Sequence, residues 1–416
     1  MTAVLLRDPA TNQQRVTAGI RQQILPLLAV FLTGAAIPMS LGINTSLITG
    51  LLVAVFAWRE IRAFRELRVI FIVTGVMIAN GVILFAYTDP LQPQSLGGAL
   101  FSAEFLINQA VAVGTVLWAF RRLGYARTCA AYGAGSLVFA VVVMGQSFNN
   151  IKYALGVPLV LMVVAAIRSQ WIAGTVAVVI ALIGMAAGAR SFAAFLAGAV
   201  VFTFIAFALN RIQRSQPAWM RYATLLLVAA VGIPVAYRVG TELLLNGYLG
   251  EFNQHRTALQ IEQTGSLITS SRPEWFATFG LMADNIWAPG PGAIPDVAQL
   301  AAARGGLHII GFDGGDYVSK YMFGGHYELH STIADMWVNF GITGLAAGIG
   351  LFAYLVFAVL REVTSPDARI ATVFVTLISL WYLLFGPLES NLPLIAFAVA
   401  LAVHRRATGA VKVPPR

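Results

Sequence analysis

The sequence has few charged residues for its length. Charged side chains make up 11% of its 416 residues, whereas hydrophobic residues make up 58%. A soluble domain carries roughly 25% charged residues, so this chain lacks the polar surface that water requires. We therefore expect lipid to be its solvent and the chain to be an integral membrane protein.

Cysteine is nearly absent, since Cys129 is the only one. A single cysteine excludes a disulfide within the chain and a metal cage made of cysteines. The sequence also lacks a glycine-rich phosphate-binding loop followed by lysine, which argues against a nucleotide-driven pump. We expect neither a metal nor another cofactor. No small-residue cleavage site follows the first apolar run, so we expect that run to be a retained helix.

Long apolar runs, in contrast, are plentiful. A helix needs about 20 apolar residues to cross the hydrocarbon core of a bilayer. By this measure the chain is an all-α polytopic membrane protein with about twelve transmembrane helices. The expected spans are 24–43, 45–58, 69–87, 99–120, 128–145, 154–167, 172–189, 191–209, 222–237, 341–360, 370–386 and 392–403.

Positive charge is distributed unevenly between the loops of this topology. With both termini in the cytoplasm, 20 of the lysine and arginine residues fall on the cytoplasmic side and 7 on the other. Cytoplasmic loops of membrane proteins carry such an excess of Lys and Arg. The net charge of +9 therefore indicates an orientation in the membrane, and we expect no nucleic-acid partner.

Most of the polar chain lies in one predicted extracytoplasmic loop. The sequence thus divides into 1–237 with nine transmembrane helices, the loop 238–329, and 330–416 with three helices and a tail. Helical patterning predicts short helices over 241–263 and 272–285, and the glycine-rich remainder is expected to be an ordered loop. A loop of this length is usually functional or disordered, and its aromatic content argues against disorder.

Arg190 is the only charged residue between Ile172 and Leu209, and it stands where one predicted helix turns into the next at the outer face. A charge at the membrane boundary is costly unless it is paired or snorkels to the headgroups. Arg190 is therefore either a snorkelling side chain or an anion clamp, because a guanidinium matches the oxygens of a phosphate.

A second arginine lies in the segment Ser271-Arg272-Pro273-Glu274-Trp275. Pro273 is typical of the first turn of a helix, with Ser271 as a candidate cap. Arg272 would then stand near the helix N-terminus, where its charge and the backbone N–H groups could face one anion together. The stretch 289–292, Pro-Gly-Pro-Gly, predicts a bend of close backbone approach. The alternative is a surface arginine on a loop helix.

The segment 325–331, Gly-His-Tyr-Glu-Leu-His-Ser, leads into the tenth span. His330 is expected to begin a helix at the membrane surface, and Gly341 and Gly344 follow at a spacing that permits close helix packing. Histidine titrates near neutrality, so His330 could take a proton from a hydroxyl. His326 and His330 would share a helix face, so they could bind a zinc ion, although no third ligand is evident. A plain interfacial histidine is the other reading.

The remaining candidates are weaker. Glu104, Lys152, Arg238, Arg256 and Glu389 are charged residues within or near the predicted outer face. An acidic residue inside a membrane is often functional, although a structural hydrogen bond serves Glu104 equally well.

The string from His330 to Gly344 resembles the signature of the O-antigen ligase superfamily, in which His and a small polar residue are followed by nine residues, Gly, two residues and Gly. Ala189-Arg190-Ser191 is similar to that family's arginine turn. The segment from Arg272 to Trp275, with the Pro-Gly-Pro-Gly bend, is similar to its Arg-x-x-x-Trp helix, although the spacing here is one residue shorter. The resemblance covers roughly residues 147–360.

This resemblance implies a metal-independent, inverting glycosyltransferase of the bacterial inner membrane, with a GT-C-like fold and an active site facing the periplasm. The donor would be a glycan on undecaprenyl diphosphate. The acceptor would be the lipid A core for a ligase, or another lipid-linked glycan for an O-antigen or exopolysaccharide polymerase. Arg190 and Arg272 would bind the diphosphate and His330 would be the base, with His326 or Glu328 orienting it.

Two alternative functions from other classes of protein stay open. A flippase or exporter of the lipid-linked sugar should carry its polar residues at the membrane midplane, whereas the candidates here cluster at the outer face. A non-catalytic scaffold of an envelope complex should tolerate loss of Arg190 and Arg272.

Overall fold

The protein is an all-α chain with the long apolar helices of a membrane protein. A computed structural model describes residues 23–39, 43–87, 92–142, 155–212, 216–312 and 315–410. Within these ranges there are helices and two isolated bridges, but no sheet. Five helices are long and apolar enough to cross a membrane: α3 (Arg65–Tyr87), α4 (Leu96–Leu123), α8 (Arg190–Ile212), α9 (Ala218–Leu245) and α14 (Thr332–Val363).

Each of the other predicted spans contains a helix within its described residues, although the first helix ends at Ala35, short of the expected residue 43. They hold the helix Gln23–Ala35, α2 (Thr45–Ile61), α5 (Tyr125–Val142), α6 (Gly156–Met162) with η3 (Val164–Ala166), α7 (Gln170–Ala186), α15 (Ile370–Phe385) and α16 (Leu388–Ala410). Long runs without charge favour helix because only a helix satisfies its own backbone polar groups in lipid. The number of helices that cross a bilayer stays a prediction.

The helices form one bundle, and polar contacts join their ends on one side. Arg122 pairs with Glu60, and Arg406 Nη1 lies 3.1 Å from Glu66 Oε1. These contacts tie the α2–α3 connection to the end of α4 and to the end of α16. We call this side the inner end. The segment 23–35 begins there too, because Arg127 of α5 donates a hydrogen bond to Gln23.

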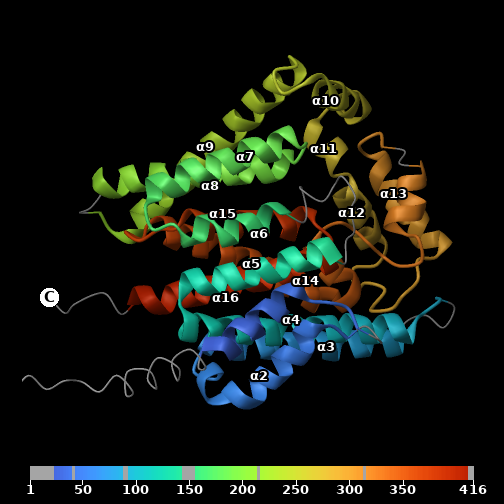
Figure 1. Cartoon of the computed structure of the whole chain (residues 1–416). Helices are drawn as coiled ribbons and strands as arrows, with labels where there is room; N and C mark the ends of the chain where they lie inside the picture. Colours follow the sequence, from blue (N-terminus) through green and yellow to red (C-terminus); the bar gives the residue numbers. More distant parts are fainter. Residues whose placement is uncertain are drawn as a thin grey trace, which may run out of the picture.

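The opposite side, which we call the outer end, carries α10 (Glu251–Thr264), α11 (Leu267–Ser271), α12 (Glu274–Asp284), α13 (Val297–His308) and the π-helical segment η4 (Tyr317–Met322). Figure 1 shows these elements at the end of the bundle away from the C-terminus. Of these elements, α12, α13 and η4 share a small core with the start of α14, in which Ala277, Leu307, Val318 and Trp337 are buried.

Two expectations for this region were wrong in detail. Helix α9 continues past residue 237 to Leu245, and after a turn α10 begins at Glu251 with Gly250 as its N-cap at φ 93°. The glycine-rich remainder is not all loop, because α13 runs through Gly305 and Gly306. Gly306 lies against the Phe276 carbonyl of α12, where a Cβ atom would stand 1.9 Å from the oxygen. Glycine in this case allows two helices to touch.

Helix α14 consists of two pieces that fold back on each other. Its path breaks at Phe340 and Gly341, and Gly341 has φ 59° and ψ −147°. A Cβ atom on Gly344 would lie 1.9 Å from the Met336 carbonyl oxygen, and one on Gly348 would lie 3.1 Å from Ile333. Residues 15 apart in one straight helix would be about 22 Å apart. Thr332–Asn339 therefore lies beside the first turns of the longer piece, and we call this unit the α14 hairpin.

Candidate active site

The amino end of the α14 hairpin is fastened to the outer end of α15. Ser331 caps the helix by accepting a hydrogen bond from the Ala334 N–H, and its hydroxyl donates to the Leu383 carbonyl at 3.2 Å. The Thr332 hydroxyl lies 3.1 Å from the Tyr382 carbonyl and 3.0 Å from that of Gly386. These bonds fix the backbone directly after His330.

Asp335 fastens the same segment to the start of α16. Its buried carboxylate accepts hydrogen bonds from the Leu329 N–H at 2.8 Å and from the Leu388 N–H at 2.9 Å. His330 is thus held from both sides of its own position. Sequence reasoning missed Asp335, although an acidic residue in an apolar run was a usable signal.

His330 does not begin the helix as expected, and its backbone is left-handed with φ 48°. Its Nδ1 lies 3.1 Å from the Glu328 carbonyl oxygen. A carbonyl oxygen only accepts hydrogen bonds, so Nδ1 carries a proton, and in the neutral imidazole Nε2 then keeps a lone pair. That lone pair is available to take a proton from another group.

Glu328 lies between the two histidines of this segment. Its Oε1 is 3.8 Å from His330 Nε2, and its Oε2 is 3.7 Å from His326 Nε2. The expectation that the histidines share a helix face was wrong, because residues 324–331 are not helical. A carboxylate in this place stabilises a positive charge on either imidazole.

Tyr317 links His330 to the segment that holds Arg272, and sequence reasoning missed it. Its ring centre is 6.2 Å from that of His330, and its hydroxyl donates a hydrogen bond to Glu274. Burial, and then the neighbouring Glu274 carboxylate, raise the pKa of Tyr317 well above its usual range. Tyr317 is therefore a neutral donor that orients a carboxylate.

Arg272 lies between α11 and α12, as the sequence predicted, with Pro273 at the N-cap of α12. The side chain of Ser271, the expected cap, lies outside the described residues. The Arg272 guanidinium is 5.6 Å from the ring centre of Trp381 on α15, and its Nε is buried without a hydrogen-bond partner among the described residues. An arginine with an unused donor is suited to an anion.

Trp275 anchors the same helix, since its indole Nε1 donates to the Leu384 carbonyl at 2.7 Å. Arg272 and His330 thus both stand at the outer end of α15, although 57 positions separate them in the sequence. Trp275 thus makes a structural contact between α12 and α15.

Arg190 is the first residue of α8, which confirms the predicted turn between two helices. Its Nη1 donates to the Thr257 hydroxyl of α10 at 3.1 Å, and Arg256 is close enough to repel its charge. Phe195 of α8 packs on Trp381 with ring centres 5.3 Å apart, so α8 and Arg272 share one neighbour. No hydrogen bond or ion pair between described residues joins Arg190 directly to Arg272 or His330.

A cavity of about 520 Å³ opens at the outer end beside this cluster. Its lining includes His326, Glu328 and Glu389, together with Gly290 and Gly292 of the Pro-Gly-Pro-Gly bend. The predicted close approach of this bend is confirmed, because a Cβ atom on Gly292 would stand 2.2 Å from the Ser95 carbonyl oxygen of the α4 cap. Glu328 borders both the cavity and His330.

The other weak candidates lie apart from this cluster. Glu104 is on α4, where its Oε1 is buried and has no hydrogen bond to any described residue, and Arg238 is exposed on α9. Lys152 falls outside the described residues. No group of three His, Cys, Asp or Glu side chains in the described ranges is arranged as a metal site would be.

Comparison of the chain with protein-family models, with curated proteins and with solved structures gives no significant match.

Proposed function

We propose that the protein is a membrane glycosyltransferase similar to O-antigen ligases. It moves a glycan from undecaprenyl diphosphate to an acceptor hydroxyl at the outer end of the bundle. The lipid A core is the expected acceptor, and a lipid-linked repeat unit is the acceptor if the chain is a polymerase. In this proposal the outer end faces the periplasm of a bacterial inner membrane.

The observation that carries this proposal is the meeting of two distant segments at the outer end of α15. Arg272 lies over the ring of Trp381, and Trp275 donates a hydrogen bond to Leu384. Ser331, the neighbour of His330, donates a hydrogen bond to Leu383. Tyr317 and its bond to Glu274 bridge the same two segments. An arginine with an unpaired donor and a histidine with a free lone pair thus share one region.

The chemistry needs little more than these groups. The acceptor oxygen attacks the anomeric carbon of the sugar, and the bond from that carbon to the diphosphate oxygen breaks. The proton of the hydroxyl passes to His330 Nε2, a transfer typically worth roughly 10²–10⁴-fold in rate. The Glu328 carboxylate, 3.8 Å away, stabilises the imidazolium that forms. Arg272, with Arg190, neutralises the negative charge that grows on the departing diphosphate.

An apolar groove supports a substrate with a hydrocarbon tail. It has a volume of about 890 Å³ and lies between α3, α4, α14 and α16. Met336 of the α14 hairpin and Leu106 of α4 are among its walls, next to Asp335 and Phe105 of the outer cavity. A lipid chain in the groove would hold its headgroup near the polar cluster.

The test is transfer by the purified full-length chain in nanodiscs with EDTA present. The donor is an undecaprenyl-diphosphate glycan, and the acceptors are lipid A core or a second lipid-linked repeat. We expect transfer by the wild type and by His308→Ala, a matched exposed histidine at the outer end, and loss in His330→Ala. Product on lipid A core identifies a ligase, and a ladder of longer lipid-linked chains identifies a polymerase.

Folded wild-type protein that transfers to neither acceptor would overturn the proposal and favour a flippase. Full activity of His330→Ala would overturn only the role of His330 as the base and would leave the proposed transfer reaction standing.

A further inference from the structure

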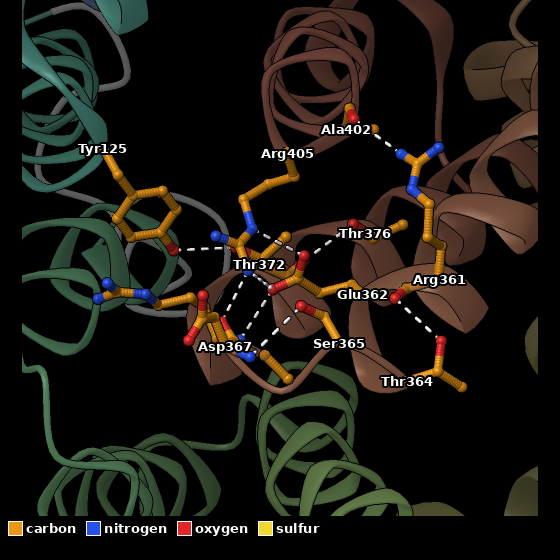
Figure 2. A network of polar contacts seen from close by, with 12 residues as sticks. Tyr125, Arg361, Glu362, Thr364, Ser365, Asp367, Thr372, Thr376, Ala402 and Arg405 are labelled. Carbon is orange, nitrogen blue, oxygen red and sulfur yellow. Dashed lines mark hydrogen bonds and ion pairs between the residues drawn. The ribbon is translucent and has the colours of Figure 1, made fainter. Parts of the chain in front are cut away.

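A second cluster of charged side chains lies at the inner end. It has no role in the proposed glycosyl transfer. Glu362, near the end of α14, is buried, and its carboxylate accepts hydrogen bonds from Arg405 Nε at 2.9 Å and Nη2 at 3.1 Å. Arg405 also donates to the Asp367 carbonyl oxygen at 2.7 Å, and Figure 2 shows it between the two acidic residues. Bidentate pairing of this kind fixes a guanidinium in one orientation.

Arg369 is held next to this pair by contacts that leave its charge in place. Its backbone N–H donates to Glu362 at 2.8 Å, and its guanidinium lies 4.9 Å from the ring centre of Tyr125. Tyr125 in turn shares a hydrogen bond of 2.9 Å with the Thr372 hydroxyl. An aromatic face attracts a cation without neutralising it.

A cavity of about 380 Å³ opens beside these arginines. It lies where the η3–α7 connection, the start of α15 and the end of α16 meet, and its charged lining is Arg168, Arg369, Arg405 and Asp367. Arg168 is exposed and has no hydrogen-bond or ion-pair partner among the described residues. Helix α15 begins at Ile370 on the cavity wall, and no side chain in the described part of the chain caps its first N–H groups.

The charges of this cavity favour an anion. Three arginines outnumber the carboxylates of Asp367 and of Glu362, which stands behind Arg405. Guanidinium groups and free helix N–H groups are the donors that phosphate oxygens prefer. Apolar residues such as Val164 and Ile167 complete the wall. The ends of apolar helices also lie at the depth of lipid headgroups.

We propose that this inner cavity binds the phosphodiester headgroup of an anionic phospholipid. Basic pockets between membrane helices are suited to such headgroups. The site is separate from the outer cluster, so it does not depend on glycosyl transfer. A bound lipid would bridge α7, α15 and α16 and stabilise their packing.

The test is native mass spectrometry of the purified full-length chain, titrated with phosphatidylglycerol or with phosphatidylcholine. Arg168→Gln and Arg369→Gln remove cavity charges, and Arg59→Gln removes an exposed arginine of the inner end outside the cavity. We expect selective binding of phosphatidylglycerol by the wild type. Each cavity variant should lose roughly tenfold in affinity, as loss of one charge-assisted hydrogen bond implies. Arg59→Gln should bind as the wild type does.

Arg168 is exposed, so Arg168→Gln keeps the fold even if Arg369→Gln does not, and thermal unfolding of both variants checks this. Equal binding of phosphatidylglycerol by the wild type and by folded Arg168→Gln would overturn the proposal. Displacement of the lipid by millimolar inorganic phosphate would overturn the proposal that the bound anion is a lipid headgroup. The cavity would then be a site for a soluble phosphate.

Discussion

At the scale of single residues, His330 combines a strained backbone with the side chain that the proposed reaction needs. A non-glycine residue at φ 48° carries strain of order 1–3 kcal/mol, which the bonds of Ser331 and Asp335 on either side offset.

His330→Gly should therefore be more stable than His330→Ala by about 1 kcal/mol, because glycine adopts positive φ without strain. Both variants should be inactive in transfer, because neither can accept the proton. Unfolding in detergent, followed by tryptophan fluorescence, measures the difference. A glycine variant less stable than the alanine variant would contradict the strain argument.

Each carboxylate oxygen of Asp335 accepts a hydrogen bond from one buried N–H group. Asp335→Asn keeps the size of the side chain but leaves one carboxamide oxygen as acceptor, so one N–H loses its partner. We expect a loss of about 1–3 kcal/mol in the free energy of unfolding. The transfer rate should fall as well, because the backbone of His330 is no longer held on both sides. Unchanged unfolding would show that the two bonds contribute little.

Tyr317 should act as a neutral positioning residue. Its raised pKa keeps the hydroxyl protonated in the folded protein. The raised pKa contributes to the free energy of unfolding at every pH below about 10, the usual pKa of tyrosine. That contribution is lost as the pH rises above 10. Tyr317→Phe should lower kcat, while the pH profile over roughly pH 6 to 9 keeps its wild-type shape. A limb of the profile that vanishes in the variant would instead show that Tyr317 titrates during the reaction.

At the scale of elements, the α14 hairpin explains the spacing between His330 and its two glycines. Gly341 makes the reversal with its positive φ, and Asn80 Nδ2 donates to the Phe340 carbonyl at 2.8 Å. Gly344 then lets the returning helix touch Met336. The predicted close packing is confirmed, but it occurs between two pieces of one helix.

Gly344→Ala should lower the free energy of unfolding by about 1–3 kcal/mol, because its Cβ atom would overlap a backbone oxygen that cannot move aside. Gly350→Ala is the matched control on the same helix, since nothing lies within 4 Å of its Cβ position. That control should be neutral or gain about 0.5–1 kcal/mol from helix propensity. Equal effects of the two substitutions would argue against the hairpin.

The sequence predicted the positions of the apolar helices well, because hydrophobic length alone determines them. It also placed Arg190 and Arg272 correctly at helix starts. It missed Tyr317, Asp335 and Trp381, whose importance arises from contacts between segments that are distant in the chain. It misjudged 326–330 because helical spacing was assumed where the backbone turns left-handed at His330.

At the scale of the whole molecule, the contacts at the two ends make a prediction about sidedness. Arg59 lies at the inner end and Lys320 at the outer end, and both are exposed. The native Cys129 is fully buried, so it does not interfere with labelling. In spheroplasts, a membrane-impermeant maleimide should label Lys320→Cys, whereas Arg59→Cys should react only after the membrane is opened. The reverse pattern would invert the proposed orientation.

The bonds that hold His330 have a consequence for the order of biosynthesis. Both arginines and the histidine precede Ile370, yet the partners that fix His330 are Leu383, Gly386 and Leu388. A nascent chain therefore carries every proposed reactive group before His330 is held in place. The site is completed only when the last two helices have entered the membrane, so a product truncated ahead of them would be inert.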